Sequence, residues 1–171
     1  MNNDIYWMKY TLKIAILAKN SGEIPVGAII VKNNKIISYG YNSSIKKNDP
    51  TAHAEIIALR KAGKFLKNYR LLNTTMYVTL EPCLMCFGAI IISRITRLVF
   101  SSYNKKYSGK NHKLGSFINL LKIYDINHKL KISSGILINK STNIIKNFFN
   151  KKRKNNFLTK RFINFEKKFK T

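Results

Sequence analysis

Apolar and polar residues follow two different periods along the chain, and each period predicts a type of element. Between residues 5 and 20 an apolar stripe recurs every three or four positions, which predicts an amphipathic helix. Its members are Ile5, Met8, Leu12, Ala15 and Ile16, with Lys19 at the end. The stretch VGAIIVKNNKIISYGYN, residues 26–42, predicts two β-strands joined by Asn33 and Asn34, which tolerate the left-handed backbone of a tight hairpin turn.

Helices and strands alternate after this hairpin. Asp49 and Pro50 predict a turn, and Thr51 is a candidate N-cap for a helix that begins in TAHAEIIAL, residues 51–59. Pro82 suits the first position of another helix, because its missing N–H has no partner there. The remaining pattern predicts strands at 75–80, 97–102 and near 130–138, helices at about 82–93 and near 116–123, and a basic amphipathic helix from Ser141.

This order of elements predicts an α/β fold of three layers, α/β/α, with a mixed sheet of about five strands between helices. A chain of 171 residues is long enough for one domain that buries roughly two thirds of its unfolded surface. Neither a repeat nor a linker divides it, so we expect a single domain over 1–171, with 140–171 as its basic C-terminal helix. Sheets of this kind bind ligands at the carboxyl ends of their strands, where helices begin.

Charge narrows the choice of partners. The 32 Lys and Arg residues against 7 Asp and Glu residues give a formal charge of +25, which attracts polyanions such as RNA or DNA. The alternative explanation for the high positive charge is drift toward A/T-rich codons, which favours Lys, Asn and Ile together. The N-terminus lacks the features of an export signal, and no apolar run reaches the roughly 18 residues of a membrane span. We therefore expect a cytoplasmic protein without a membrane segment.

The chemistry is predicted by two short motifs, HAE at 53–55 and PCLMC at 82–86. Cys83 and Cys86 are the only cysteines, and a pair so close in sequence is a poor structural crosslink. Taken singly, His53 is explained as a structural residue and the cysteines as a redox pair. Taken together, two thiolates on one face of a helix and an imidazole form a ligand set that favours Zn²⁺.

Glu55 has a role distinct from ligation. Residues two apart in a regular helix diverge by roughly 200°, so His53 and Glu55 serve one centre only if the motif lies at a helix start. Three protein ligands leave a fourth position for water, and a neighbouring carboxylate can take its proton and return it to a substrate. A closed structural zinc site would need His112 or His128 as a fourth ligand. Neither lies at a sequence separation from the other three ligands that is typical of zinc sites.

The two motifs match the H-x-E and P-C-x-x-C signature of zinc-dependent deaminases. The sequence resembles the cytidine and deoxycytidylate deaminase superfamily, and within it the bacterial tRNA-specific adenosine deaminases. DPTAHAEIIALR and YVTLEPCLMC are its most specific segments, and the resemblance covers nearly the whole chain. It implies a homodimeric hydrolase acting on C–N bonds of cyclic amidines, which converts the wobble adenosine of a tRNA anticodon loop to inosine and releases ammonia.

The resemblance also implies roles for particular residues. His53, Cys83 and Cys86 would hold one Zn²⁺ per subunit, and Glu55 would shuttle protons. Asn42 would recognise the base; the alternative is that it serves only as a turn residue after the hairpin. Val26 and the backbone near Ala54 would line the purine pocket. The expected substrate is the anticodon stem-loop of an arginine tRNA. The candidate phosphate contacts are Arg70, Lys105, Lys106, Lys110 and the cluster 151–154.

The chain departs from the family pattern in two places. Tyr103 and Asn104 replace an Arg-Asp pair ahead of a longer lysine-rich loop, which puts the preference for RNA flanking the target in question, and Phe87 replaces a small residue. Two rival functions remain, namely a deaminase for a free base, nucleoside or nucleotide, and an RNA-binding module without turnover. The high positive charge and the basic C-terminal helix favour an RNA substrate, and the intact motifs favour turnover.

Overall fold

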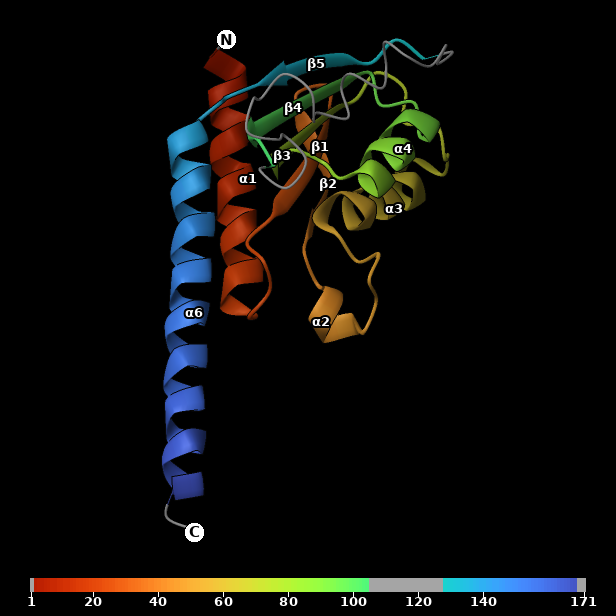
Figure 1. Cartoon of the computed structure of the whole chain (residues 1–171). Coiled ribbons are helices and arrows are strands. Elements are labelled where there is room, and N and C mark those ends of the chain that lie inside the picture. The colour runs from red at the N-terminus through yellow and green to blue at the C-terminus, as the bar shows by residue number, and fades with distance from the viewer. Residues whose placement is uncertain (1, 105–127, 169–171) are drawn as a thin grey trace.

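The computed structural model describes residues 2–104 and 128–168, and it places a five-stranded sheet between two layers of helices (Figure 1). The strand order is β2-β1-β3-β4-β5. The elements are α1 Asn2–Asn20, β1 Gly27–Lys32, β2 Lys35–Tyr41, α2 Ser44–Lys47, α3 Ala54–Leu66, β3 Thr75–Leu80, α4 Leu84–Ile92, β4 Arg97–Ser102, β5 Lys131–Ser134 and α6 Ile138–Lys168. The predicted α/β class and mixed sheet are confirmed. The helix predicted near 116–123 lies outside the described residues.

The sheet combines an antiparallel half with a parallel half. β1 pairs antiparallel with both β2 and β3, whereas β3, β4 and β5 run parallel. Asn33 and Asn34 form the turn between β1 and β2 with φ angles of 48° and 57°, which confirms the predicted hairpin. Because β3 and β4 are parallel, the segments that follow them leave the sheet at the same edge.

Each face of the sheet is covered by its own helices. α3 and α4 cover one face, and α1 and α6 lie on the other (Figure 1). The predicted stripe of α1 is partly wrong, because Ile5 is exposed, while Trp7 is buried against Ile29 and Val99 of the sheet. Burying the large indole ring of Trp7 removes more apolar surface from water than burying Ile5 would, so the helix is rotated toward Trp7.

Several predicted boundaries are also wrong. Thr51 does not cap a helix, because its N–H and its hydroxyl both donate to Asp49 Oδ1 at 2.7 Å. α3 begins three residues later, with His53 as its N-cap. α4 likewise begins at Leu84 with Cys83 as N-cap, so Pro82 precedes the helix.

The end of the sheet is shorter than predicted, and the last helix is longer. Gly135 has a φ of 87° and ends β5, so the strand covers residues 131–134 instead of 130–138. α6 consequently begins at Ile138, ahead of Ser141. No helix in the described part of the chain has both the length and the apolar character needed to cross a membrane. The expectation of one domain over 1–171 stays a prediction.

A close approach between β2 and α3 positions the start of α3. Gly40 of β2 lies so near this helix that a Cβ atom there would come within 2.7 Å of Ala58 N and 2.9 Å of Ile57 Cβ. Ser38, also in β2, donates its hydroxyl to Ala58 O at 2.8 Å. The backbone of the first turns of α3 is therefore seated directly on the sheet.

Candidate active site

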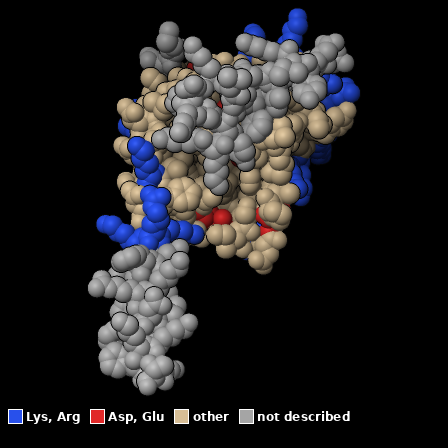
Figure 2. All heavy atoms as spheres, viewed as in Figure 1, with Lys and Arg blue, Asp and Glu red and all other residues tan. Residues whose placement is uncertain are grey.

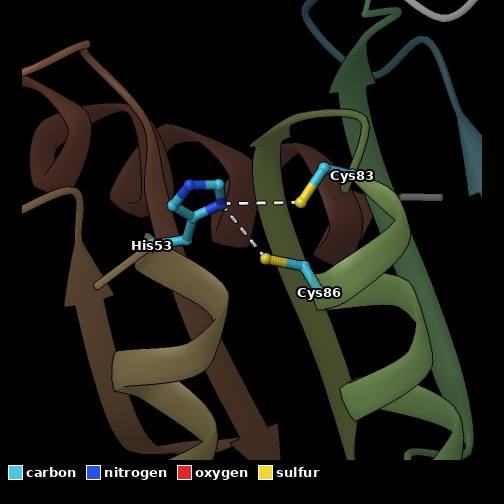
Figure 3. Close-up of side chains that lie close together, drawn as sticks. All are labelled: His53, Cys83 and Cys86. Carbon is cyan, nitrogen blue, oxygen red and sulfur yellow. Dashed lines mark hydrogen bonds between the residues drawn. The ribbon is translucent and has the colours of Figure 1, made fainter. Parts of the chain in front are cut away.

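Three metal-binding side chains meet where α3 and α4 begin. His53 is the N-cap of α3, Cys83 is the N-cap of α4, and Cys86 lies in the first turn of α4. His53 Nδ1 is 3.6 Å from Cys83 Sγ and 3.4 Å from Cys86 Sγ (Figure 3). The three ligand atoms all lie within 4.8 Å of one another. The fold thus brings together the two motifs that the sequence places about thirty residues apart.

The geometry of this cluster fits a zinc ion. Zinc bound tetrahedrally at its usual distances holds a nitrogen and a sulfur ligand about 3.6 Å apart. The observed distances from His53 Nδ1 to the two sulfurs agree with this spacing. Among the described residues this is the only group of three or more His, Cys, Asp or Glu side chains able to hold a metal. His128 lies elsewhere, with Nε2 2.6 Å from Ile95 O, and His112 is outside the described residues.

The electrostatics of the cluster also favour a metal. The Cys86 thiol donates toward Cys83 Sγ and lowers the pKa of Cys83 to about 4. The same contact and burial raise the pKa of Cys86, and the contact with Cys83 raises the pKa of His53. Cys83 also sits at a helix N-terminus, where the helix dipole favours an anion. Cys83 is therefore favoured as a thiolate, whereas Cys86 and His53 would have to release their protons when a divalent cation binds.

Glu55 lies beside the cluster at the start of α3. The backbone of His53 is extended, with φ −74° and ψ 155°, while Ala54 and Glu55 already belong to the helix. This change of direction lets His53 and Glu55 line the same cavity, as the position of the motif at a helix start predicts. Glu55 is buried, and desolvation raises the pKa of its carboxyl to about 7. A carboxyl with such a pKa can accept and return a proton near neutral pH.

A cavity of about 530 Å³ opens next to His53, Glu55 and Cys83, and its volume falls in the range of small-molecule sites. Val26 and Asn42 both line this cavity. Ala54 is fully buried instead, and its N–H donates to Asn42 Oδ1 at 3.0 Å. The backbone at Ala54 therefore holds Asn42 in place.

The long C-terminal helix forms part of this cavity, which sequence reasoning did not foresee. Thr142, Ile145, Lys146, Phe149 and Arg153 of α6 belong to the lining. The helix is anchored by a buried hydroxyl network, in which Ser141 Oγ donates to Thr79 O and lies 3.2 Å from Ser102 Oγ. The basic, aromatic pattern of FFNKKRK was the signal available in the sequence.

Glu81 is a second buried carboxylate of the lining that sequence reasoning missed. Its position directly before PCLMC in a chain poor in acidic residues was the available signal. Tyr103 and Asn104, which mark the departure from the family pattern, also line the cavity. They directly follow β4, so the segment that leaves this strand contributes to the cavity wall.

The candidate phosphate contacts are distributed unevenly. Lys and Arg side chains gather on the part of α6 just ahead of the grey atoms (Figure 2), where residues 151–154 are all exposed. Arg70 is exposed as well, and its guanidinium donates to the hydroxyl of Tyr69. Lys105, Lys106 and Lys110 lie outside the described residues.

A mixed sheet with a His-Cys-Cys cluster and a buried glutamate beside a cavity of this size defines a zinc-dependent deaminase. Residues 1–102 match the cytidine and deoxycytidylate deaminase zinc-binding region, and the chain belongs to this family. A tRNA-specific adenosine deaminase from Buchnera aphidicola subsp. Schizaphis graminum is 55% identical over 152 residues, covering 89% of this chain and 97% of the relative.

Two solved structures share the fold at appreciable identity. One, from a study of A-to-I editing by tRNA deaminases at the wobble position of transfer RNA, superposes with a TM-score of 0.72 at 32% identity. It covers 81% of this chain and 98% of its own. The other is a guanine deaminase from Bacillus subtilis, with a TM-score of 0.56 at 38% identity, covering 66% of this chain and 72% of its own. The chain is thus similar both to a deaminase of transfer RNA and to a guanine deaminase.

Proposed function

We propose that this protein is a zinc-dependent hydrolase that converts the wobble adenosine of a tRNA anticodon loop to inosine. The observation that carries the proposal is the His53, Cys83 and Cys86 cluster with Glu55 beside it, in a cavity partly walled by the basic helix α6. The tRNA-specific adenosine deaminase from Buchnera aphidicola, which matches 89% of this chain, supports the choice of substrate.

In this proposal His53, Cys83 and Cys86 hold Zn²⁺, which supplies Lewis acidity and brings the pKa of water toward neutrality. Glu55 takes a proton from the attacking water and delivers it to adenine N1 as the water oxygen bonds to C6. The carboxylate of Glu55 then takes the remaining proton from the oxygen on C6 and passes it to the amino group, so that the C6=O bond forms as the C6–N bond breaks and ammonia leaves. The raised pKa of Glu55, about 7, suits both directions of transfer.

Asn42 and Val26 shape the purine site. Asn42 is 9% exposed, and its Oδ1 is engaged by the N–H of Ala54. The side-chain amide can thus offer its NH₂ group to an acceptor on the base. Val26 donates its N–H to Ile24 O and accepts at its carbonyl from the N–H of Asn42, and its side chain adds an apolar surface to the cavity. Asn42 is therefore a recognition residue whose orientation depends on the first turn of α3.

Several features favour RNA over a free base. Lys146 and Arg153 line the cavity itself, and the exposed cluster 151–154 continues along α6. An anticodon loop presents unpaired bases that can be splayed out at little cost, while basic side chains hold its phosphates. An arginine tRNA is the specific substrate we propose, and the cytoplasm is where its anticodon would be met. A guanine deaminase is the second candidate, because one such enzyme shares the fold at 38% identity.

We propose further that the enzyme is a homodimer that uses α4. Leu84 is 55% exposed and Ile92 is 71% exposed on this helix, although α4 carries the two cysteines. Large apolar side chains grouped on an exposed helix are typical of association surfaces. Sedimentation of the purified protein, with Ile92→Glu as the disrupting variant, tests this assembly.

The substrate is tested by incubating the protein with an arginine tRNA anticodon stem-loop that carries wobble adenosine. Free adenosine, guanine and cytidine are incubated in parallel, and mass spectrometry follows the change in mass on deamination. We expect inosine in the stem-loop and no turnover of the free compounds. Turnover of guanine or a nucleoside, with none on the stem-loop, would refute the RNA substrate.

Two variants separate the metal from the proton shuttle. Glu55→Ala should keep one zinc per chain, measured by metal analysis, and lose at least about 10²-fold in rate. Cys83→Ala should lose the metal together with the activity, because two ligands do not retain zinc at a site built for three. An active Glu55→Ala enzyme would show that another group moves the proton.

A further inference from the structure

The acidic residues of this chain are few, and those that the structure describes have particular tasks. Only 7 Asp and Glu residues accompany 32 Lys and Arg residues. Apart from Glu55, the described acidic residues each accept a hydrogen bond from elsewhere in the fold. The pairs are Asp4 with Arg97 and Tyr77, Glu23 with the N–H of Lys46, Asp49 with Thr51, and Glu81 with the N–H of Asn104. Among the described residues, a carboxylate therefore marks a specific internal contact.

Glu81 is the acidic residue of this group that lies in the active-site cavity. It follows β3, two residues ahead of Cys83, and is only 3% exposed. Its Oε2 accepts a hydrogen bond of 3.1 Å from the N–H of Asn104, which lies just beyond the end of β4. The side chain thus links the segments that leave two adjacent parallel strands, and both segments line the cavity.

The backbone of Glu81 is held without its side chain. Its own N–H donates to Ser102 O at 2.8 Å, so the chain that enters α4 is fixed to β4 by the main chain. Losing the carboxylate should therefore leave Cys83 and Cys86 in place. What depends on the carboxylate is the segment on the other side of the bond, Tyr103 and Asn104.

Tyr103 is braced by its side chain as well. Its ring packs edge-on against Phe100 with centroids 5.3 Å apart, and its hydroxyl lies 2.8 Å from Ser134 Oγ. Asn104 is the next residue, and Glu81 holds its N–H. The contact from Glu81 therefore holds the main chain at the point where the cavity wall leaves β4.

We propose that Glu81 is a positioning residue that holds Asn104, and with it Tyr103, in the wall that the substrate meets. This inference rests on the proposed function for the identity of the substrate. The property that matters is a buried acceptor for the N–H of Asn104, so a neutral amide oxygen at the same place would serve equally well. Glu81 neither ligates the metal nor transfers a proton.

The test compares Glu81→Ala with Glu81→Gln in the full-length zinc-loaded protein. On the wobble-adenosine stem-loop we expect Glu81→Ala to raise KM about tenfold, because a buried N–H loses its acceptor, with kcat within about threefold of the wild type. Zinc should remain at one per chain. Glu81→Gln should restore the KM of the wild type, since its side-chain oxygen can accept the same bond.

Asp4→Asn serves as the matched control. Asp4 is also a partly buried acidic residue with internal partners, but it lies on α1 and does not line the active-site cavity. This variant should lower the melting temperature without changing KM. The comparison separates a general loss of stability from a displacement of Tyr103 and Asn104 in the cavity wall.

A readout without substrate keeps the inference separate from the proposed function. Amide hydrogen exchange at Asn104, followed by NMR, should be fast in Glu81→Ala and protected in the wild type and in Glu81→Gln. If the wild type fails to deaminate the stem-loop while this pattern holds, the proposed substrate is wrong and the positioning contact stands.

Three results would overturn the inference. The first is a Glu81→Gln enzyme as impaired as Glu81→Ala, which would assign the role to the negative charge. The second is a large loss of kcat or of zinc in Glu81→Ala at unchanged KM. The third is unchanged kinetics and exchange in Glu81→Ala. If Glu81→Ala does not fold, Glu81→Asp, whose carboxylate is retracted by one methylene, must show a KM above that of Glu81→Gln.

Discussion

Gly40→Ala should damage catalysis although Gly40 contacts no reacting group. The added Cβ would lie 2.7 Å from Ala58 N and 2.9 Å from Ile57 Cβ, and it would overlap the carbonyl oxygen of Ala54. These atoms belong to α3 and are mostly backbone, so a rotamer change cannot relieve the clash. The helix must move away from β2.

The size of this movement follows from the contact distances. Ordinary Cβ contacts begin near 3.4 Å, so α3 must retreat by at least about 0.7 Å. Its first turn carries Glu55, and His53 is its N-cap. A displacement of about 1 Å in a catalytic constellation can cost about 10²-fold in rate, and overpacking of this kind costs about 1–3 kcal/mol of stability.

The assay measures kcat on the wobble-adenosine stem-loop together with the zinc content and the urea unfolding curve. Gly63→Ala is the matched control, because it changes a glycine of the same helix whose added Cβ would meet nothing closer than Asn68 O at 3.5 Å. That variant should keep its activity and gain up to about 1 kcal/mol from the better helix propensity of alanine. A Gly40→Ala enzyme with the kcat and stability of the wild type would refute the link between β2 and the site.

Other predictions concern stability and RNA binding. Arg97 holds the pKa of Asp4 below its usual range, so this pair stabilises the fold at neutral pH and the contribution disappears as the pH falls through that lowered pKa. Asp4→Asn should lose about 1 kcal/mol at pH 7 but nothing in strong acid, measured by urea unfolding. Ser101 Oγ is the buried side-chain polar atom without a partner among the described residues, so Ser101→Ala should be neutral or stabilising by about 1 kcal/mol, whereas Ser102→Ala should destabilise. Lys154→Ala should remove about one phosphate contact and so reduce, by about one, the slope of log binding constant against log salt concentration for the stem-loop.

The local pattern of residues was sufficient to predict most elements and the ligand set. A hairpin through Asn33 and Asn34 depends on backbone preferences that two neighbouring residues carry by themselves. The spacing of Cys83 and Cys86 needs only one helical turn, and the position of HAE at a helix start needs only the turn before it. Predictions of this kind succeed because their physical causes lie within a few residues along the chain.

Other features could not be predicted in this way. The buried stripe of α1 includes Trp7 and excludes Ile5, because the sheet that covers it selects the rotation of the helix. Thr51 is satisfied by Asp49, which moves the N-cap of α3 to His53. The rotation of α1 is decided by contacts with the sheet, whereas the start of α3 is a choice between two local hydrogen-bonding arrangements of the same turn.

The sequence by itself determined the types of element, the α/β class and the candidate zinc ligands, because periodicity and side-chain chemistry act over short distances. Only the tertiary structure decided that α6 walls the cavity, that Glu81 holds Asn104, and that Gly40 seats α3 on β2. Such contacts join residues that are far apart in the chain, and their energies exist only after the sheet has aligned its strands. The +25 charge and the contiguous basic cluster 151–154 are properties of the sequence, whereas the position of α6 beside the cavity is a property of the fold.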